Sequence, residues 1–196
     1  MSRALVLSAC AAAVAACAGA YDAAQTPPTV VATEERLRPG YDAEMREVIR
    51  AQAQRDHASE CGAVTVPDRA IIPLELTGGG LPEYAVTFGR VLCAADGGQS
   101  TRWQGTGGPL VQFWRGSGGP PRIMLEQTMH GFSVVDGQLI AQQHGGFCPG
   151  GAGPNVCVVT YMWDERTRRL EVITRLFDEN GGGLAPMQYG YGELTG

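Results

Sequence analysis

The chain has 196 residues, with 15 Lys and Arg against 20 Asp and Glu, which gives a formal net charge of −5 at pH 7. An acidic chain without a basic stripe is not expected to bind nucleic acid. Its length fits one domain of ordinary size once an export signal is set aside.

The first seventeen residues have the features of a bacterial export signal. Arg3 supplies one positive charge, and the run from Ala4 to Ala16 is apolar or small throughout. This run is too short to span a bilayer, which needs about 20 apolar residues, but it fits the core of a signal peptide. Val14–Cys17 matches the lipobox, the motif that ends on the cysteine to be lipidated. We therefore predict that residues 1–17 are a lipoprotein signal and that Cys17 is the lipidation site.

One alternative is a cytosolic protein with an unusual N-terminal segment, and another is cleavage by ordinary signal peptidase. Ala18-Gly19-Ala20 is a suitable site for a cut before Tyr21, and the product would be soluble in the periplasm or secreted. In the lipoprotein case the domain faces the periplasm and is anchored to the membrane through Cys17. Residues 18–40, which contain Pro27-Pro28, are then a flexible tether between anchor and domain.

The residues after the tether predict a single helix. Asp42 is expected to cap a helix over 43–58, because Met45, Val48 and Ile49 share one helical face. The apolar stripe fades after Ile49, so this is a packing helix of modest strength.

From Cys61 onward, short apolar runs alternate with turn signals, which is typical of a β domain. Asp136-Gly137 is a two-residue hairpin turn, and residues 164–168 form a longer one. The predicted strands are 70–76, 84–93, 110–115, 122–127, 132–135, 138–142, 156–163 and 170–176. The predicted fold is mainly β (α+β): an antiparallel β-meander sheet with one N-terminal helix, over residues 41–177. Residues 178–196 are Gly-rich and polar and are predicted to be a disordered tail.

The cysteines favour an oxidising compartment. Setting aside Cys10 and Cys17 leaves four of the six, an even number. In an exported protein this number predicts two disulfides, and the alternative is four buried free thiols. Three pairings are possible, of which Cys61–Cys93 with Cys148–Cys157 is the most local. The chain has no C-x-x-C spacing, so a zinc site or a thioredoxin-like site is poorly supported.

Residues 74–86, LELTGGGLPEYAV, have the outline of a calcium loop of the D-x-N-x-D-G-x-x-D type. Glu75, Thr77 and Glu83 take the first, third and ninth positions, but Gly79 stands where an aspartate is needed. Calcium prefers six to eight oxygen ligands, several of them carboxylate. Calcium binding here is therefore expected to be weak or absent, and a glycine-rich turn is the favoured interpretation.

Several segments together resemble a family of small, uncharacterised exported proteins of Gram-negative bacteria. They are the export signal, IIPLELTGGGLPEYAVTFGRVLC, a Gly-rich segment with Trp103, HGGFCPGGAGPNVC and YMWDERTRRLEV. In that family the first segment reads like D-L-N-G-D-G-x-x-D-Y, similar to the calcium loops of FG-GAP repeats. This chain departs from the pattern, because the aspartates are missing and residues 104–108 lack the usual pair of cysteines. The resemblance implies no known activity.

Candidate catalytic residues are few. His130, His144 and Cys148 suggest a Cys–His nucleophile, but a disulfide to Cys157 would remove it. Aromatic residues are better candidates for binding a partner, namely Trp103, Phe113 and Trp114. Phe113 and Trp114 are adjacent in one strand, so they lie on opposite faces, and one is exposed unless the helix or a loop covers it.

The sequence therefore favours a non-enzymatic cell-envelope lipoprotein, without a cofactor, that binds an envelope protein or serves as a structural module. Two alternatives stay open: a weak calcium-binding module at residues 75–83, and a periplasmic inhibitor of a lysozyme-like hydrolase.

Overall fold

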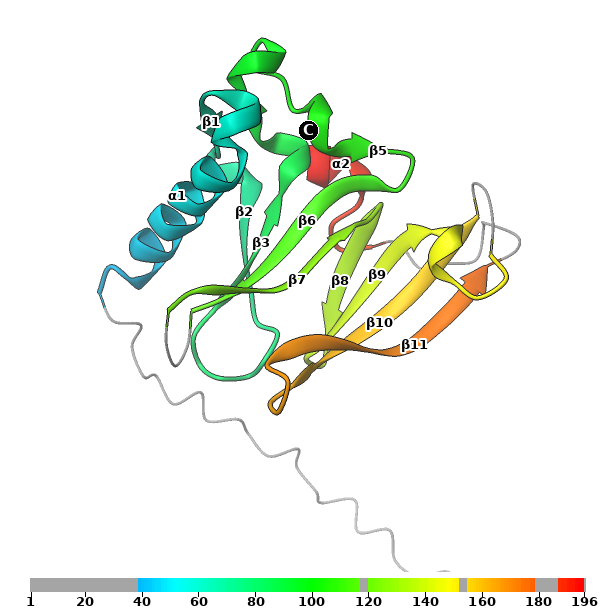
Figure 1. The fold of residues 1–196 in the computed structure, drawn as a ribbon. Helices are drawn as coiled ribbons and strands as arrows, with labels where there is room; N and C mark the ends of the chain where they lie inside the picture. The colour runs from blue at the N-terminus through cyan, green and yellow to red at the C-terminus, as the bar shows by residue number, and fades with distance from the viewer. Residues whose placement is uncertain (1–38, 117–119, 152–154, 179–186, 196) are drawn as a thin grey trace, which may run out of the picture. The chain divides into compact units, whose positions relative to one another are not determined.

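The computed structural model describes residues 39–116, 120–151, 155–178 and 187–195 (Figure 1). The chain divides into a segment Met1–Thr33, which lies outside these ranges, and a unit Glu34–Gly196, which holds every element described below. The predicted signal, Cys17 and nearly all of the predicted tether fall outside the described residues.

The described elements are one long helix, eleven strands and a short C-terminal helix. The helices are α1 (Tyr41–Cys61) and α2 (Tyr191–Thr195). The strands are β1 (Val64–Thr65), β2 (Ile71–Leu74), β3 (Glu83–Thr87), β4 (Leu92–Cys93), β5 (Gln104–Gly105), β6 (Gly108–Arg115), β7 (Arg122–Thr128), β8 (Gly131–Val135), β9 (Gln138–His144), β10 (Val156–Asp164) and β11 (Arg169–Asp178).

The long strands form two antiparallel sheets. In the first, β3 lies between β2 and β6, and β6 also pairs with β7 and with the short β5. The second is a meander in the order β11-β10-β9-β8. A separate two-stranded ladder joins β1 to β4. The predicted mainly β fold with an N-terminal helix is confirmed, and its strands are divided between two large sheets.

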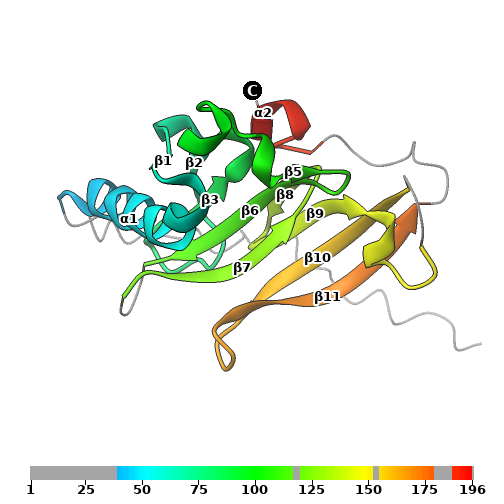
Figure 2. The same cartoon turned by 45° about the horizontal axis from the view of Figure 1, so that its top comes forward.

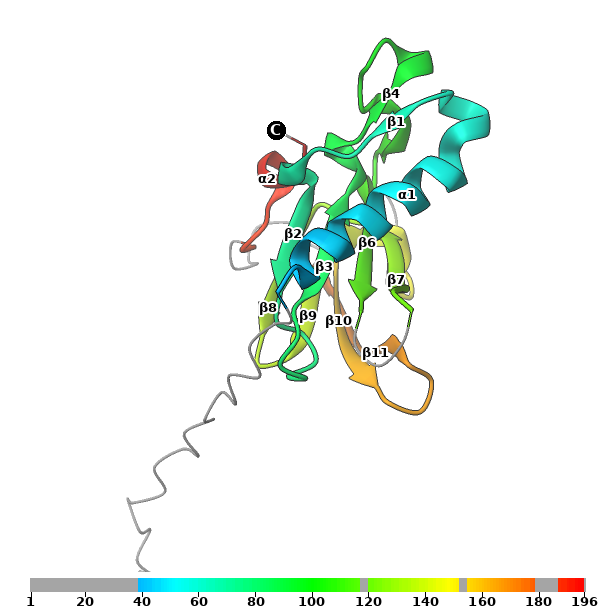
Figure 3. The same cartoon turned by 90° about the vertical axis from the view of Figure 1, so that its left-hand side faces the viewer.

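Two apolar cores separate three layers (Figure 2). One core lies between the two sheets and includes Phe113, Phe132 and Tyr161. The other lies between α1 and the opposite face of the first sheet, and it includes Met45, Ile49 and Trp114. Figure 3 looks onto this side, where α1 crosses the strands of the first sheet. The second sheet therefore has one face in the core, while its other face points away from the first sheet.

The start of α1 differs from the prediction. The helix begins at Tyr41 with Gly40 as its N-cap, in the left-handed conformation at φ 92°, and no side chain caps it. Asp42 lies in the first turn, where its carboxylate accepts hydrogen bonds from Arg46 Nε at 2.8 Å and Tyr84 Oη at 3.1 Å. These partners occupy the side chain that was expected to cap the helix. The end of the helix is later than predicted, at Cys61.

The predicted strand 84–93 is in fact broken. β3 ends at Thr87, a 3₁₀ turn covers Phe88–Arg90, and β4 contains only two residues. At this turn a Cβ on Gly89 would lie 2.5 Å from the carbonyl oxygen of Leu194, so the backbone of the C-terminal segment packs directly against it.

The predicted disordered tail is wrong for residues 187–195. Phe132 of β8 and Tyr189 exchange two backbone hydrogen bonds, both 2.9 Å long. Leu194 is fully buried, and its carbonyl accepts a hydrogen bond of 2.6 Å from Thr87 Oγ1. Polar composition predicted a tail, but one buried leucine and these backbone contacts are enough to dock the segment. Residues 179–186 and 196 lie outside the described residues.

Candidate functional site

The carboxylate of Glu83 lies at the base of the loop that resembles a calcium loop. Glu83 is only 1% exposed. It accepts hydrogen bonds from Leu76 N at 2.9 Å, from Thr77 N at 3.2 Å and from the Thr77 hydroxyl. The hydrogen-bond donors of the β2–β3 connection thus surround the buried carboxylate and satisfy it.

Arg115 supplies a positive charge inside this loop. Its Nε lies 3.9 Å from Glu83 Oε1, and one of its terminal nitrogens lies 3.7 Å from where a Cβ on Gly79 would be. Its guanidinium also stacks over the Trp163 ring, 4.3 Å from the centroid. The guanidinium thus provides charge compensation of the kind that a bound cation would provide.

The three candidate calcium ligands are not equivalent in the structure. Thr77 and Glu83 contact each other. Glu75 is exposed, and no hydrogen bond or ion pair joins its side chain to another described residue. Within the described ranges, no three His, Cys, Asp or Glu side chains are grouped to hold a metal ion. Glu83 is the one carboxylate that the loop encloses.

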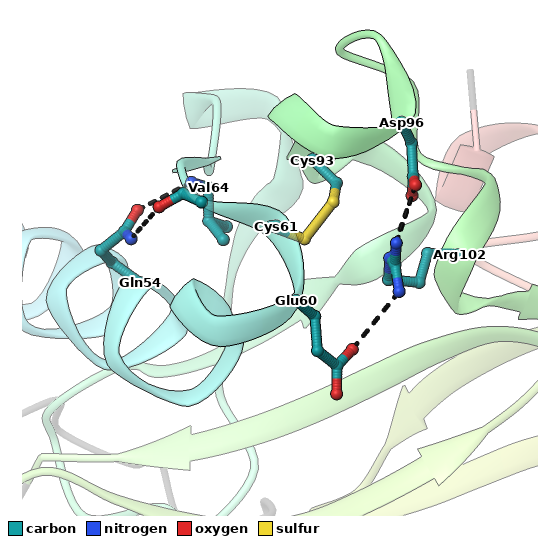
Figure 4. The surroundings of a disulfide bond; sticks show 8 residues. Gln54, Glu60, Cys61, Val64, Cys93, Asp96 and Arg102 are labelled. Carbon is teal, nitrogen blue, oxygen red and sulfur yellow. Dashed lines mark hydrogen bonds and ion pairs between the residues drawn. A yellow bond between two sulfur atoms is a disulfide. The ribbon is translucent and has the colours of Figure 1, made fainter.

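The four cysteines form the most local of the three pairings. Cys61–Cys93 joins the end of α1 to β4, and Cys148–Cys157 joins the loop after β9 to β10. Polar contacts reinforce the first bridge (Figure 4): Arg102 forms a two-pronged contact with Asp96, at 2.8 and 3.0 Å, and lies 3.5 Å from Glu60. The bridge therefore fixes the end of α1 to the β1–β4 ladder, whose strands are only two residues long.

The histidine and cysteine pattern does not form a nucleophile. Cys148 is bonded to Cys157, and a disulfide sulfur cannot attack a substrate. His130 and His144 are neighbours, and burial together with the charge of His144 lowers the pKa of His130 below its ordinary value. His57 packs edge-on against Phe88 and Trp103, with ring centroids 5.4 and 5.1 Å away.

Two of the three aromatic residues predicted to bind a partner are buried. Phe113 is in the core between the sheets, and Trp114 is in the core under α1, so both faces of β6 are covered. Neither Phe113 nor Trp114 is therefore exposed to a partner, because α1 and the second sheet provide the cover that the sequence analysis left open. Trp103 is half-buried beside Phe88 and stays a candidate.

A surface that the sequence analysis missed is the outer face of the β8–β11 sheet. Strand register assigns side chains to this face, because directly paired residues point the same way. Its positions are Gly131, Ser133, Val135, Gln138, Ile140, Gln142, His144, Val156, Val158, Thr160, Met162, Asp164, Arg169, Glu171, Thr174, Leu176 and Asp178. The Asp, Glu and Arg residues among them are Asp164, Arg169, Glu171 and Asp178, which lie on β11 or at the end of β10. We call this set the outer face.

Apolar side chains on the outer face are open to solvent. Val135 is 49% exposed, Met162 47% and Leu176 64%. These three come from β8, β10 and β11, so the exposed groups extend across the sheet. Period-two alternation in β8–β10 was the sequence signal for this face, but it does not reveal which face the first sheet covers.

No protein-family model, curated protein or solved structure matches the chain. The resemblance to exported Gram-negative proteins therefore stays a prediction. Among the described helices, none has the length and apolar character needed to cross a membrane.

Proposed function

We propose that this protein is a non-enzymatic lipoprotein of the cell envelope that binds another envelope protein through the outer face. The observation that carries the proposal is that exposed apolar side chains extend across the four strands β8–β11, while the Asp, Glu and Arg side chains of the outer face lie on the edge strand β11 or at the end of β10. Surfaces of this kind mark binding sites, because the centre of a protein interface is depleted in charge.

Export and anchoring have separate support. The apolar run before Cys17 and the lipobox favour a lipid anchor, and the two disulfides fit a compartment where such bonds persist. The absence of a reactive thiol at Cys148 favours binding over nucleophilic catalysis. A domain held at a membrane by one lipid and a tether can present its outer face to a partner on the same membrane.

Binding is tested by affinity capture from envelope extracts. The face variant carries Val135→Glu and Met162→Glu, both on exposed side chains, so the fold should be kept. The control variant carries Ala51→Glu and Ser59→Glu on the exposed side of α1, which adds the same charge in a different layer. We expect wild type and control to retain the same partner and the face variant to lose it. Equal capture by all three would refute the outer face as the binding site.

The anchor is tested separately with Cys17→Ser. We expect this variant to move from the membrane fraction to the soluble periplasm, because a Ser at this position cannot receive the thioether-linked lipid. If the variant stays with the membrane exactly as wild type does, the protein is not held there by lipid on Cys17.

A further inference from the structure

The two edge strands of the β8–β11 sheet differ in whether another described segment pairs with them. At β8 the C-terminal segment covers the edge, since Phe132 and Tyr189 exchange backbone hydrogen bonds and Gln188 N donates to Ser133 Oγ at 2.7 Å. At the opposite edge, β11 pairs with β10, and no other described strand forms a ladder with it. One edge is thus closed and the other presents free backbone N–H and C=O groups.

β11 has only part of the usual protection of an edge strand. Native edges are blocked by proline, by charged side chains (lysine above all), by bulges or by very short strands. β11 spans ten residues, RLEVITRLFD, without proline, glycine or lysine, but it carries four charged residues and an irregularity at Ile173. Val172 and Ile173 are 39% and 43% exposed, in addition to Leu176. A ten-residue edge with exposed apolar side chains can pair with another strand when the charges along it meet opposite charges.

We infer that β11 pairs with β11 of a second copy of this chain, in an antiparallel two-fold ladder that joins the two β8–β11 sheets. The register that uses the whole strand places position 169 opposite position 178, with the axis between Ile173 and Thr174. It also places Leu170 opposite Phe177 and Glu171 opposite Leu176.

The irregularity at Ile173 makes this register possible. In a regular strand, Leu170 and Phe177 are an odd number of residues apart and would lie on opposite faces. The ladder with β10 shifts between Thr160 and Tyr161, which leaves Ile173 as an extra residue in β11. As a result, Leu170 and Phe177 both face the core between the sheets, opposite Trp163 and Cys157 of β10. Directly paired residues of the two copies then point to the same face, as a ladder requires.

The space beside Leu170 suits the partner copy's side chain. A groove of about 500 Å³ lies between β7 and the beginning of β11, with Met124, Leu125 and Leu170 among its lining residues. The register places Phe177 of the second copy at this groove. At each end of the ladder the sequence places Arg169 opposite an acidic residue, Asp178, and opposite charges at directly paired positions stabilise a ladder.

Pairing in this way would extend the outer face into one eight-stranded surface, with Leu176 of both copies near the axis. A two-fold interface of this kind is self-complementary and closes after two copies, so it limits assembly at a dimer. The inference does not depend on the identity of the envelope partner, because it concerns the edge of the sheet and not the outer face.

The test uses the exported Cys17→Ser protein and sedimentation equilibrium over a range of concentrations. We expect a dimer, a dissociation constant about tenfold weaker for Arg169→Glu or Asp178→Arg alone, and recovery in the double variant. Arg166→Glu in the adjacent turn is the matched control and should leave the dimer unchanged. A monomer at every concentration would overturn the inference.

Cysteine cross-linking checks the register. In the double variant Glu171→Cys, Leu176→Cys, each new thiol lies directly opposite one of the partner copy, so a covalent dimer should form on mild oxidation. The single variant Glu171→Cys should not cross-link, because its two copies lie on opposite sides of the axis. A dimer that survives charge reversal at Arg169 and gives no cross-link would place the interface elsewhere and refute the β11 ladder.

Discussion

Glu83 is the carboxylate on which the prediction of weak or absent calcium binding depends. A buried carboxylate needs either hydrogen-bond donors or a positive charge, and Glu83 has both, from residues 76–77 and from Arg115. The loop keeps the outline of a calcium site, while its charge is compensated from within the protein. Aligning the loop with the calcium-loop pattern identified Glu83 as a candidate ligand. It could not show that Arg115 of β6, 32 residues further along the chain, lies beside Glu83.

Replacing Glu83 with glutamine tests this compensation. The amide has only one acceptor oxygen, and its NH₂ group would face the donors of Thr77 or Arg115. We expect the free energy of unfolding to fall by about 2 kcal/mol, the scale of a hydrogen bond to a charged group, as measured by urea unfolding. Glu75→Gln, at an exposed position in the same loop, should change it little. Equal effects of the two substitutions would contradict the role given to Glu83.

Calcium itself gives a second test at this loop. Because Arg115 already balances Glu83 and Glu75 is exposed, millimolar calcium is expected to leave the Tm of the wild type unchanged and to produce no binding heat. A ligand that binds only the folded state stabilises it by RT ln(1 + [L]/Kd) and therefore raises the Tm. A clear rise in Tm with calcium, lost in Glu83→Gln, would support a calcium-binding module.

His130 predicts a dependence of stability on pH. Burial and His144 lower the pKa of His130 in the folded state below its ordinary value of 6.5. The unfolded chain therefore binds the proton more readily, and stability falls as the pH drops below about 6.5 towards the folded pKa. His130→Gln should make the free energy of unfolding flatter between pH of about 7.5 and about 5.5, measured by urea unfolding. An unchanged slope would show that His130 does not titrate in this way.

At the scale of elements, the C-terminal segment packs against the domain although its polar composition predicted a disordered tail. Residues 187–195 cover the edge of β8 and place Leu194 in the core. Turn chemistry was informative elsewhere: Asp136-Gly137 forms the predicted hairpin, with both residues at positive φ. Short apolar runs between turn signals likewise located β6 to β11 to within a few residues. The docking of α2 depends on a contact with Gly89 more than 100 residues away, and no local pattern encodes such a contact.

Gly89→Ala tests how this segment is held. The added methyl group would lie 2.5 Å from the carbonyl oxygen of Leu194 and 3.0 Å from Pro109 and Thr195 side-chain atoms. We expect α2 to be displaced, with a loss of about 1–3 kcal/mol, typical of overpacking, and faster proteolysis after residue 186. Gly105→Ala, where no atom lies within 4 Å of the new methyl group, is the control. Equal proteolysis of both variants would contradict tight packing at Gly89.

At the scale of the whole molecule, the three-layer arrangement explains why the outer face is left open. The first sheet is covered by α1 on one side and by the second sheet on the other, which buries Phe113 and Trp114. The second sheet is covered by the first sheet on one side, and apolar residues remain exposed on its other side. The order of the strands along the chain could not predict which sheet face is exposed. A single sheet and two stacked sheets give the same pattern of apolar runs and turns in the sequence.

The disulfides contribute at this scale as well. In the chain-entropy description, closing the loop between Cys61 and Cys93 stabilises the fold by about 4 kcal/mol, and the shorter loop between Cys148 and Cys157 by about 3 kcal/mol. These are large amounts relative to the net stability of a domain, which is about 5–15 kcal/mol. Cysteine parity predicted two bridges, and the fold selects the pairing because it brings the end of α1 to β4 and the loop after β9 to β10.

Export to an oxidising compartment is the premise on which the envelope role rests, and the state of the four cysteines tests it most directly. The protein isolated from envelope fractions is denatured without reductant, alkylated and digested, and its cysteine peptides are identified by mass spectrometry. We predict no alkylation at Cys61, Cys93, Cys148 or Cys157, and two linked peptide pairs, Cys61–Cys93 and Cys148–Cys157. Four alkylated cysteines in the native material would contradict this account.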